Sequence, residues 1–140
     1  MTLEFVDTNI LLYAYDPGAG QRHEQARELV GRLGRGRTGA LSVQVLQELY
    51  VNLIRKVAVP VAPSAALVRL RALSRWRAHS PQPRDVIAAV ELSERYQLAF
   101  WDAMIVNSAA RLGCTVLWTE DLNPGQEISG VRVSNPFTEA

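Results

Sequence analysis

The stretch LEFVDTNILLYAYD (residues 3–16) places a carboxylate, Asp7, between two apolar segments. Its first four residues predict a short strand over 3–6, and the apolar residues that resume at Ile10 predict a helix over 8–15. We expect burial at such a junction, and a buried carboxylate is costly unless it is paired. Asp7 therefore either caps the helix that follows or belongs to a site whose chemistry requires an acid.

Length and composition indicate one globular domain over residues 1–140. Hydrophobic residues make up 48% of the chain and charged residues 21%, which is typical of folded proteins. The single cysteine, Cys114, excludes an internal disulfide and suits a reducing compartment. No apolar run reaches the roughly 18 residues of a membrane span, and the first residues lack a signal-peptide pattern. We therefore expect a cytoplasmic protein with no membrane contact.

The net charge of +1 does not by itself indicate a nucleic-acid binder. Fourteen of the fifteen basic residues are arginine, however, and arginine binds phosphate well; a biased genomic base composition explains this equally well. The segment RLRALSRWR (69–77) is either a phosphate-binding face or, more simply, a solvated helix surface with Trp76 in the core.

Strand and helix patterns alternate along the chain and predict an α/β fold. A parallel sheet with helices on both faces follows from this alternation. The strands are expected at 3–6, 40–43, 115–118 and 131–133, and the helices at 8–15, around 26–33, and at 44–57, 64–77, 83–97 and 102–113, with a loop at 34–39 (GRGRTG).

Three aspartates stand where apolar segments give way to helices or loops. Asp7 follows the first strand, Asp121 follows the strand at 115–118, and Asp102 opens a helix. Parallel strands end at one edge of their sheet, so these carboxylates can converge there. Two carboxylates about 5 Å apart repel by roughly 3 kcal/mol at an effective dielectric constant near 20. A hard divalent cation with oxygen ligands, such as Mg²⁺ or Mn²⁺, offsets such repulsion.

Each acid also has a simpler interpretation. Asp7 and Asp102 are typical helix N-caps, and Asp121 in TEDLNPG is typical of a turn. Glu48 lies opposite the apolar stripe of its helix, beside Gln44 and Asn52, and by pattern alone is solvated surface. Spacing therefore leaves both readings open.

Four segments, in order, resemble the PIN-domain family, and within it the VapC toxins of type II toxin–antitoxin systems. They are FVDTNILLYAYD (5–16), LSVQVLQELYVNL (41–53), FWDAMIVNSA (100–109) and LWTEDLNPGQEISGVRVSNPF (117–137). The resemblance spans nearly the whole chain and implies a single PIN-like domain.

The resemblance assigns roles to particular residues. It implies an acidic catalytic quartet of Asp7, Glu48, Asp102 and Asp121, with Asp7 and Asp102 as the main ligands of Mg²⁺ or Mn²⁺. It implies supporting positions for Thr8, Asn9 and Thr119, and it turns the polar stripe of Gln44, Glu48 and Asn52 toward the groove. Glu120 is a further carboxylate beside Asp121, and we expect it to support the site through a water molecule or the metal.

The implied activity is metal-dependent cleavage of RNA by a toxin. A cognate antitoxin and a homodimer are the implied partners. The alternatives are a non-toxin PIN nuclease that processes RNA or cuts DNA, and an inactive PIN fold that serves as a binding module. A phosphoacceptor domain needs a lysine after a late strand, whereas Lys56 falls in a predicted helix. A haloacid-dehalogenase-type phosphatase needs Asp-x-Asp, whereas the chain has Asp7-Thr8-Asn9.

Overall fold

The computed structural model describes residues 2–55, 57 and 59–138. The described strands form one sheet, in the spatial order β3-β2-β1-β4-β6-β5, and its neighbours are parallel except for the antiparallel pair β5 and β6. The strands are β1 (Glu4–Val6), β2 (Gly39–Ser42), β3 (Arg77–His79), β4 (Val116–Trp118), β5 (Glu127–Ile128) and β6 (Val131–Ser134). The predicted α/β class is confirmed.

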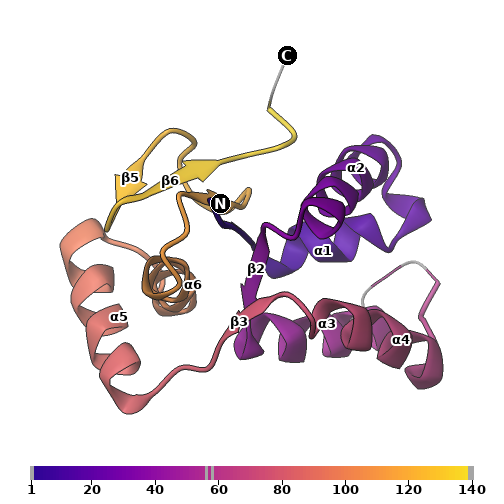
Figure 1. Cartoon of the computed structure of the whole chain (residues 1–140), viewed down its shortest axis with the longest axis horizontal. Coiled ribbons are helices and arrows are strands. Elements are labelled where there is room, and N and C mark those ends of the chain that lie inside the picture. The colour runs from indigo at the N-terminus through magenta and orange to yellow at the C-terminus, as the bar shows by residue number, and fades with distance from the viewer. Residues whose placement is uncertain (1, 56, 58, 139–140) are drawn as a thin grey trace.

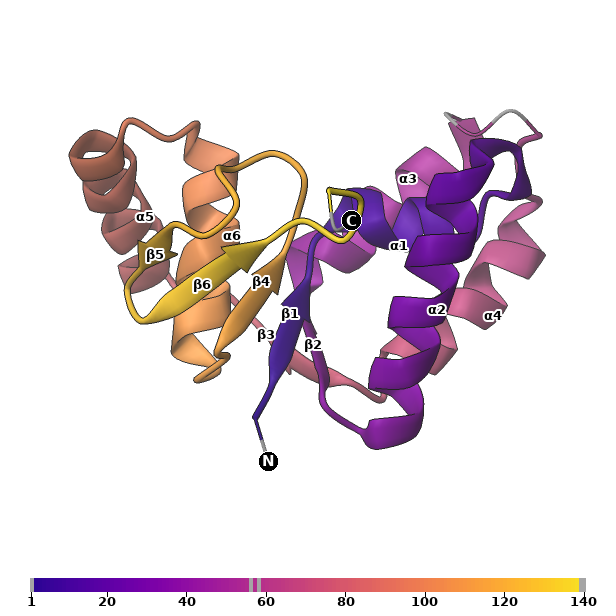
Figure 2. The ribbon, with the colours of Figure 1, turned by 90° about the horizontal axis from the view of Figure 1, so that it is seen from above.

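Helices cover both faces of this sheet. Helices α5 and α6 pack together on one side, and α1 to α4 lie on the other (Figures 1 and 2). The helical segments are α1 (Thr8–Ala14), the 3₁₀ turn η1 (Pro17–Ala19), α2 (Gln21–Gly36), α3 (Val43–Arg55), α4 (Pro63–Leu73), α5 (Pro83–Tyr96) and α6 (Phe100–Arg111). Within the described residues, none of these helices has the length and hydropathy to cross a membrane.

Apolar periodicity accounts for most of the core. The four apolar residues that predict the second helix, Ala26, Leu29, Val30 and Leu33, are all buried. The central strands β1 and β2 are buried almost throughout, as parallel strands covered on both faces must be. Because β1, β2 and β4 are parallel, their carboxyl ends lie at one edge of the sheet.

The structure differs from the sequence-based prediction at the weakest elements. Strands β3 and β5 are not predicted, because one is a three-residue, mostly exposed strand and the other has only two residues. Helix α4 ends at Leu73 instead of residue 77, since the chain turns there to enter β3. Helix α2 takes in the first half of the predicted loop at 34–39. Lys56 lies outside the described residues.

Trp76 packs against the core, as the simpler interpretation predicts. Its ring lies against the start of β2, where a Cβ on Gly39 would come within 2.5 Å of the indole. The segment 69–77 is therefore divided between the end of α4, a turn and β3, and it does not form one arginine-rich helix face.

A buried carboxylate fastens α5 to α6. Asp85 is fully buried, and its Oδ1 accepts hydrogen bonds from Asn107 Nδ2 (3.0 Å) and Arg111 Nε (2.9 Å). Its Oδ2 accepts from the backbone N–H of Gln82 (2.7 Å) and lies 3.5 Å from His79 Nε2. Burial alone raises the pKa of this carboxyl, but these donors and charges together lower it to about 2. The network fixes the helix that carries Asp102.

We predict that Asp85→Asn lowers the free energy of unfolding by about 3 kcal/mol at pH 7, because it removes the charge from a buried ion-pair network. The pKa of Asp85 is lower in the folded protein than in the unfolded chain, so its contribution is present above about pH 4 and is lost as the pH falls toward 2. Urea unfolding between pH 2 and pH 7 measures this. The control is Glu91→Gln, at an exposed position of α5, and equal stability of Asp85→Asn and the unmodified protein at pH 7 would contradict the prediction.

Candidate active site

Asp7 occupies the junction between β1 and α1. It is the N-cap of α1, and its Oδ1 accepts a hydrogen bond from the backbone N–H of Thr8 (2.7 Å). The capping interpretation is therefore correct for this residue. Capping does not account for its burial, however, because Asp7 is only 7% exposed and its second oxygen is bonded to Thr119, just after β4.

The neighbouring strand β4 brings Asp121 to the same edge. The backbone N–H of Asp7 donates to the carbonyl oxygen of Trp118 (3.0 Å), which aligns the ends of β1 and β4. The Thr119 hydroxyl then donates to Asp7 Oδ2 (2.8 Å) and accepts from the backbone N–H of Asp121 (3.1 Å). Thr119 thus ties the loop that carries Asp121 to Asp7.

Glu48 reaches the site from α3. The Thr8 hydroxyl donates to Glu48 Oε1 (2.8 Å), so the residue after Asp7 orients this second acid. The polar stripe of α3, with Gln44 and Asn52 one turn to either side, lines the same pocket. The solvated-surface interpretation of Glu48 is therefore wrong, because α3 packs its apolar face on α1 and β2 and turns its polar face toward the edge of the sheet.

Asp102 comes from the first turn of α6. The N-cap of this helix is Ala99, with no side-chain cap, so the interpretation of Asp102 as an N-cap is wrong. Helix α6 leads into β4, and its amino end therefore lies at the carboxyl edge of the sheet. The positive end of the helix dipole favours a carboxylate there.

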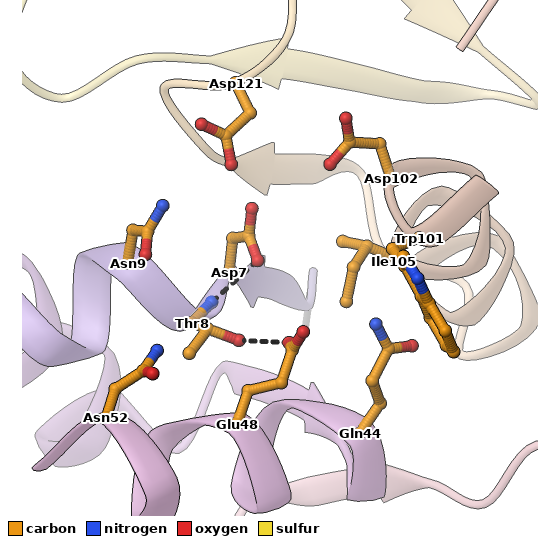
Figure 3. Close-up of a pocket in the computed structure, with 10 residues that line it drawn as sticks. All are labelled: Asp7, Thr8, Asn9, Gln44, Glu48, Asn52, Trp101, Asp102, Ile105 and Asp121. Carbon is orange, nitrogen blue, oxygen red and sulfur yellow. Dashed lines mark hydrogen bonds between the residues drawn. The ribbon is translucent and has the colours of Figure 1, made fainter. Parts of the chain in front are cut away.

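These four acids line one pocket with a volume of about 220 Å³ (Figure 3). The remaining lining residues are Thr8, Asn9, Gln44, Asn52, Trp101 and Ile105. In Figure 3 the carboxylates of Asp7, Asp102 and Asp121 point toward the same space, with Glu48 below them. Residues that are far apart in sequence therefore surround one polar hollow.

Burial and mutual repulsion raise the pKa values of the aspartates. Burial is the main cause at Asp7, where the pKa rises to about 6; the charges of Asp121 and Glu48 add to this, and the hydrogen bonds from Thr119 and Thr8 oppose it. Burial also raises the pKa of Asp102, with further contributions from the charges of Asp121 and Glu48. The pKa of Asp121 is raised by burial and by Glu120. The negative charges of these aspartates are therefore only partly offset by the groups around them.

The four acids are the right chemical type of ligand for a hard divalent cation, because carboxylate oxygens are the ligands that Mg²⁺ and Mn²⁺ prefer. The raised pKa of Asp7 is a second sign of fit, since a bound cation relieves the repulsion that contributes to it. Among the described residues, however, no three acidic, histidine or cysteine side chains stand close enough to form a ready-made metal site. Binding an ion therefore requires these side chains to draw together.

The structure separates Glu120 from the pocket. Its Oε1 accepts a hydrogen bond from the Tyr13 hydroxyl (2.6 Å), and its Oε2 pairs with Arg22 (3.3 Å). Glu120 is not among the pocket-lining residues, so direct contact with a bound ion is not supported. Thr8 and Thr119 instead make the supporting contacts expected of them, and Asn9 lines the pocket.

Sequence reasoning missed two lining residues, Trp101 and Ile105. Helical spacing carries the signal that could have found them. Ile105 lies three residues after Asp102 and four after Trp101, so all three share a face of α6.

A family model for the PIN domain matches residues 5–125. The chain belongs to the PIN-domain family. This confirms the assignment made from the four sequence segments. No curated protein matches the sequence of this PIN domain at a significant level.

Solved structures share the fold of this PIN domain. A chain of a toxin–antitoxin complex from Klebsiella pneumoniae is 24% identical, with a TM-score of 0.67 over 95% of this chain and 97% of the other. VapC20 from Mycobacterium tuberculosis, a toxin that cleaves the sarcin–ricin loop, is 22% identical, with a TM-score of 0.64 over 81% of this chain and 86% of VapC20. A chain of the DNA-bound VapBC complex from Salmonella typhimurium is 21% identical, with a TM-score of 0.65 over 97% of this chain and 99% of the other.

We predict that Asp7→Asn stabilises the metal-free PIN domain at pH 8. Asp7 has a higher pKa in the folded protein (about 6) than in the unfolded chain (3.8), so stability falls as the pH rises through this interval. Asparagine caps helices as well as aspartate does, and removing the charge gains at most about 3 kcal/mol. Urea unfolding in chelator measures this gain, which should disappear below pH 4.

The control for this measurement is Asp16→Asn, at a partly exposed residue that caps the 3₁₀ turn η1. It should give no comparable gain at pH 8. The prediction is wrong if Asp7→Asn is less stable than the unmodified protein at pH 8 and is destabilised by the same amount at pH 4. The charge of Asp7 would then not be the destabilising feature.

Proposed function

We propose that this PIN domain is a metal-dependent endoribonuclease and the toxin of a type II toxin–antitoxin system. The observation that carries the proposal is the shared pocket: Asp7, Glu48, Asp102 and Asp121 line one polar hollow at the carboxyl edge of the sheet. A buried carboxylate that is repelled by neighbouring acids, as Asp7 is, destabilises the fold, and such perturbed acids cluster at functional sites. Binding a divalent cation next to a phosphodiester is the use that fits an all-oxygen set.

Asp7 and Asp102 would hold the ion, and Glu48 and Asp121 would complete its surroundings directly or through water. Mg²⁺ or Mn²⁺ bound there supplies an activated water molecule and neutralises charge that develops on the phosphate. Asp7 is held for this role by Thr8 and Thr119, and Glu48 by Thr8. Asp121 is exposed, so its carboxylate is accessible to a proton from solvent or substrate.

The similar solved structures support the assignment to a toxin. Two come from toxin–antitoxin or VapBC complexes, and a third is a toxin that cleaves the sarcin–ricin loop. By analogy, an antitoxin protein would block the pocket of this chain, RNA would be its substrate, and the toxin would form a homodimer in the cytoplasm.

We predict that the purified chain cleaves RNA with Mg²⁺ or Mn²⁺ and that excess chelator abolishes the cleavage. Asp7→Asn and Asp102→Asn should each lower the cleavage rate at least 10³-fold, because each removes a charged ligand, while circular dichroism shows an intact fold. Gel assays on labelled cellular RNA measure this, with Asp16→Asn as the active control. Cleavage that persists in chelator would refute metal dependence.

The same variants can be examined without an activity assay. Mn²⁺ should raise the melting temperature of the unmodified chain, because the ion binds the folded state. It should leave the melting temperature of Asp7→Asn unchanged.

We predict an intermediate effect for Thr8→Val. Valine has nearly the same shape as threonine but cannot donate to Glu48, so the acid loses its orientation while the ligands remain. Partners of this kind typically contribute 10- to 100-fold. Single-turnover cleavage rates should fall by about that factor, and rates equal to those of the unmodified chain would show that the Thr8 contact is dispensable.

Co-expression tests the toxin assignment. Expression of the chain alone should arrest growth, and co-expression of the open reading frame immediately upstream should relieve the arrest. An active nuclease that causes no arrest would indicate RNA processing or DNA cleavage instead. A folded chain that binds nucleic acid without cleaving it would indicate a binding module.

A further inference from the structure

Trp101 lines the pocket but has no part in the proposed metal chemistry. Its side chain is 62% exposed, and it packs edge-on against Phe100, with ring centroids 5.0 Å apart. A single exposed apolar side chain is ordinary in itself, but an exposed aromatic ring that lines a polar pocket is free to stack on a ligand. Trp101 directly precedes Asp102, so its indole stands at the mouth of the acidic pocket.

Gln44 lies on the same side of the pocket and carries an unusual amide. Its side-chain nitrogen and oxygen are both buried, and neither has a hydrogen-bond partner among the described residues. In Figure 3 this amide points toward the indole of Trp101. Buried polar atoms are nearly always paired in folded proteins, so an amide that is unpaired and lines a pocket is poised to bind a ligand.

We propose that Trp101 and Gln44 form a nucleobase-binding subsite beside the acidic cluster; this rests on the function proposed above. A base stacks on the exposed indole, which is a sequence-tolerant interaction. The Gln44 amide offers one donor group and one acceptor next to each other, and base edges present the complementary pair. Because Trp101 is exposed, its indole can shift while it remains stacked on the base, and this shift admits the edge of the base to the buried Gln44 amide. The phosphodiester next to that base then lies over the carboxylates.

Binding of short RNAs to the full chain tests the subsite. The probes are labelled octanucleotides of adenosine, uridine or cytidine, and an abasic ribose-phosphate strand of equal length and charge. Fluorescence anisotropy is measured in Ca²⁺ buffer, with gels to confirm that the probe is intact. The unmodified chain should bind at least one base-containing probe about tenfold more tightly than the abasic strand, which is the range expected for stacking of a base.

Trp101→Ala should abolish this preference and leave the affinity for the abasic strand unchanged. The matched control is Ile87→Ala, because Ile87 is similarly exposed (64%) on α5, away from the pocket-lining residues. This control should keep the preference. The stacking role is wrong if Trp101→Ala keeps the preference for base-containing RNA, or if it weakens the binding of base-containing and abasic strands equally.

Gln44→Met separates a binding role from a structural one. Methionine fills similar space without polar atoms, so it should raise the melting temperature of the free protein, because it removes two unpaired buried atoms. It should also weaken the base-containing probe about fivefold and leave the abasic strand unaffected. A lower melting temperature together with equal weakening of both probes would show that Gln44 is structural and overturn its part in the subsite.

The outcomes distinguish this inference from the proposed function. If the unmodified chain cleaves RNA but binds base-containing and abasic strands equally, the subsite is wrong and the nuclease proposal stands. If it neither binds nor cleaves RNA, both are overturned.

Discussion

The hydrogen-bonded burial of Asp7 is the interaction on which the rest of the site depends. One carboxylate oxygen accepts from the first N–H of α1, and the other accepts from Thr119 at the end of β4. Thr119 in turn accepts from the backbone of Asp121, and Thr8 donates to Glu48. Three of the four acids are therefore positioned through a single buried side chain and the two threonines beside it.

A comparison of two buried aspartates, Asp85 and Asp7, shows why the burial of Asp7 has a functional meaning. Asp85 is buried among hydrogen-bond donors that include the Arg111 guanidinium, and together these groups lower its pKa to about 2, so its charge stabilises the fold. Asp7 is buried beside other acids, and its pKa is raised to about 6, so its charge destabilises the metal-free fold. Proteins commonly retain such local destabilisation at sites of chemistry and compensate for it elsewhere. Asp85 provides part of that compensation, because it secures the helix that presents Asp102.

The sequence predicts the α/β architecture well because apolar periodicity specifies both the core helices and the central strands. It also locates Asp7 and Asp121, since both follow strands that are themselves easy to recognise. It does not predict β3 or β5, which have too few apolar residues to give a pattern. Edge strands of this kind form because a neighbour supplies hydrogen-bond partners, and that information is tertiary.

Glu48 and Trp101 show the limits of pattern reading at the site. The helical pattern places Glu48 opposite the apolar stripe but cannot tell solvent from a polar pocket, and only the resemblance to PIN domains corrects this. Trp101 reads as an ordinary apolar residue, whereas the structure exposes it at the pocket. Glu120 looks like a member of the acidic cluster, yet Tyr13 and Arg22 hold it elsewhere. In each case the direction of a side chain depends on packing that the local sequence does not encode.

The central claim is that these carboxylates form a divalent cation site that includes Asp7. Calorimetric titration of the chain with Mn²⁺ at pH 6, in buffers of different ionisation enthalpy, tests it most directly, because metal binding must displace the proton from Asp7. Because burial and the neighbouring acids raise the pKa of Asp7 to about 6, the account predicts saturable binding with clear proton release at pH 6 and much less release at pH 8. Absence of binding, or binding without proton release at pH 6, would contradict it.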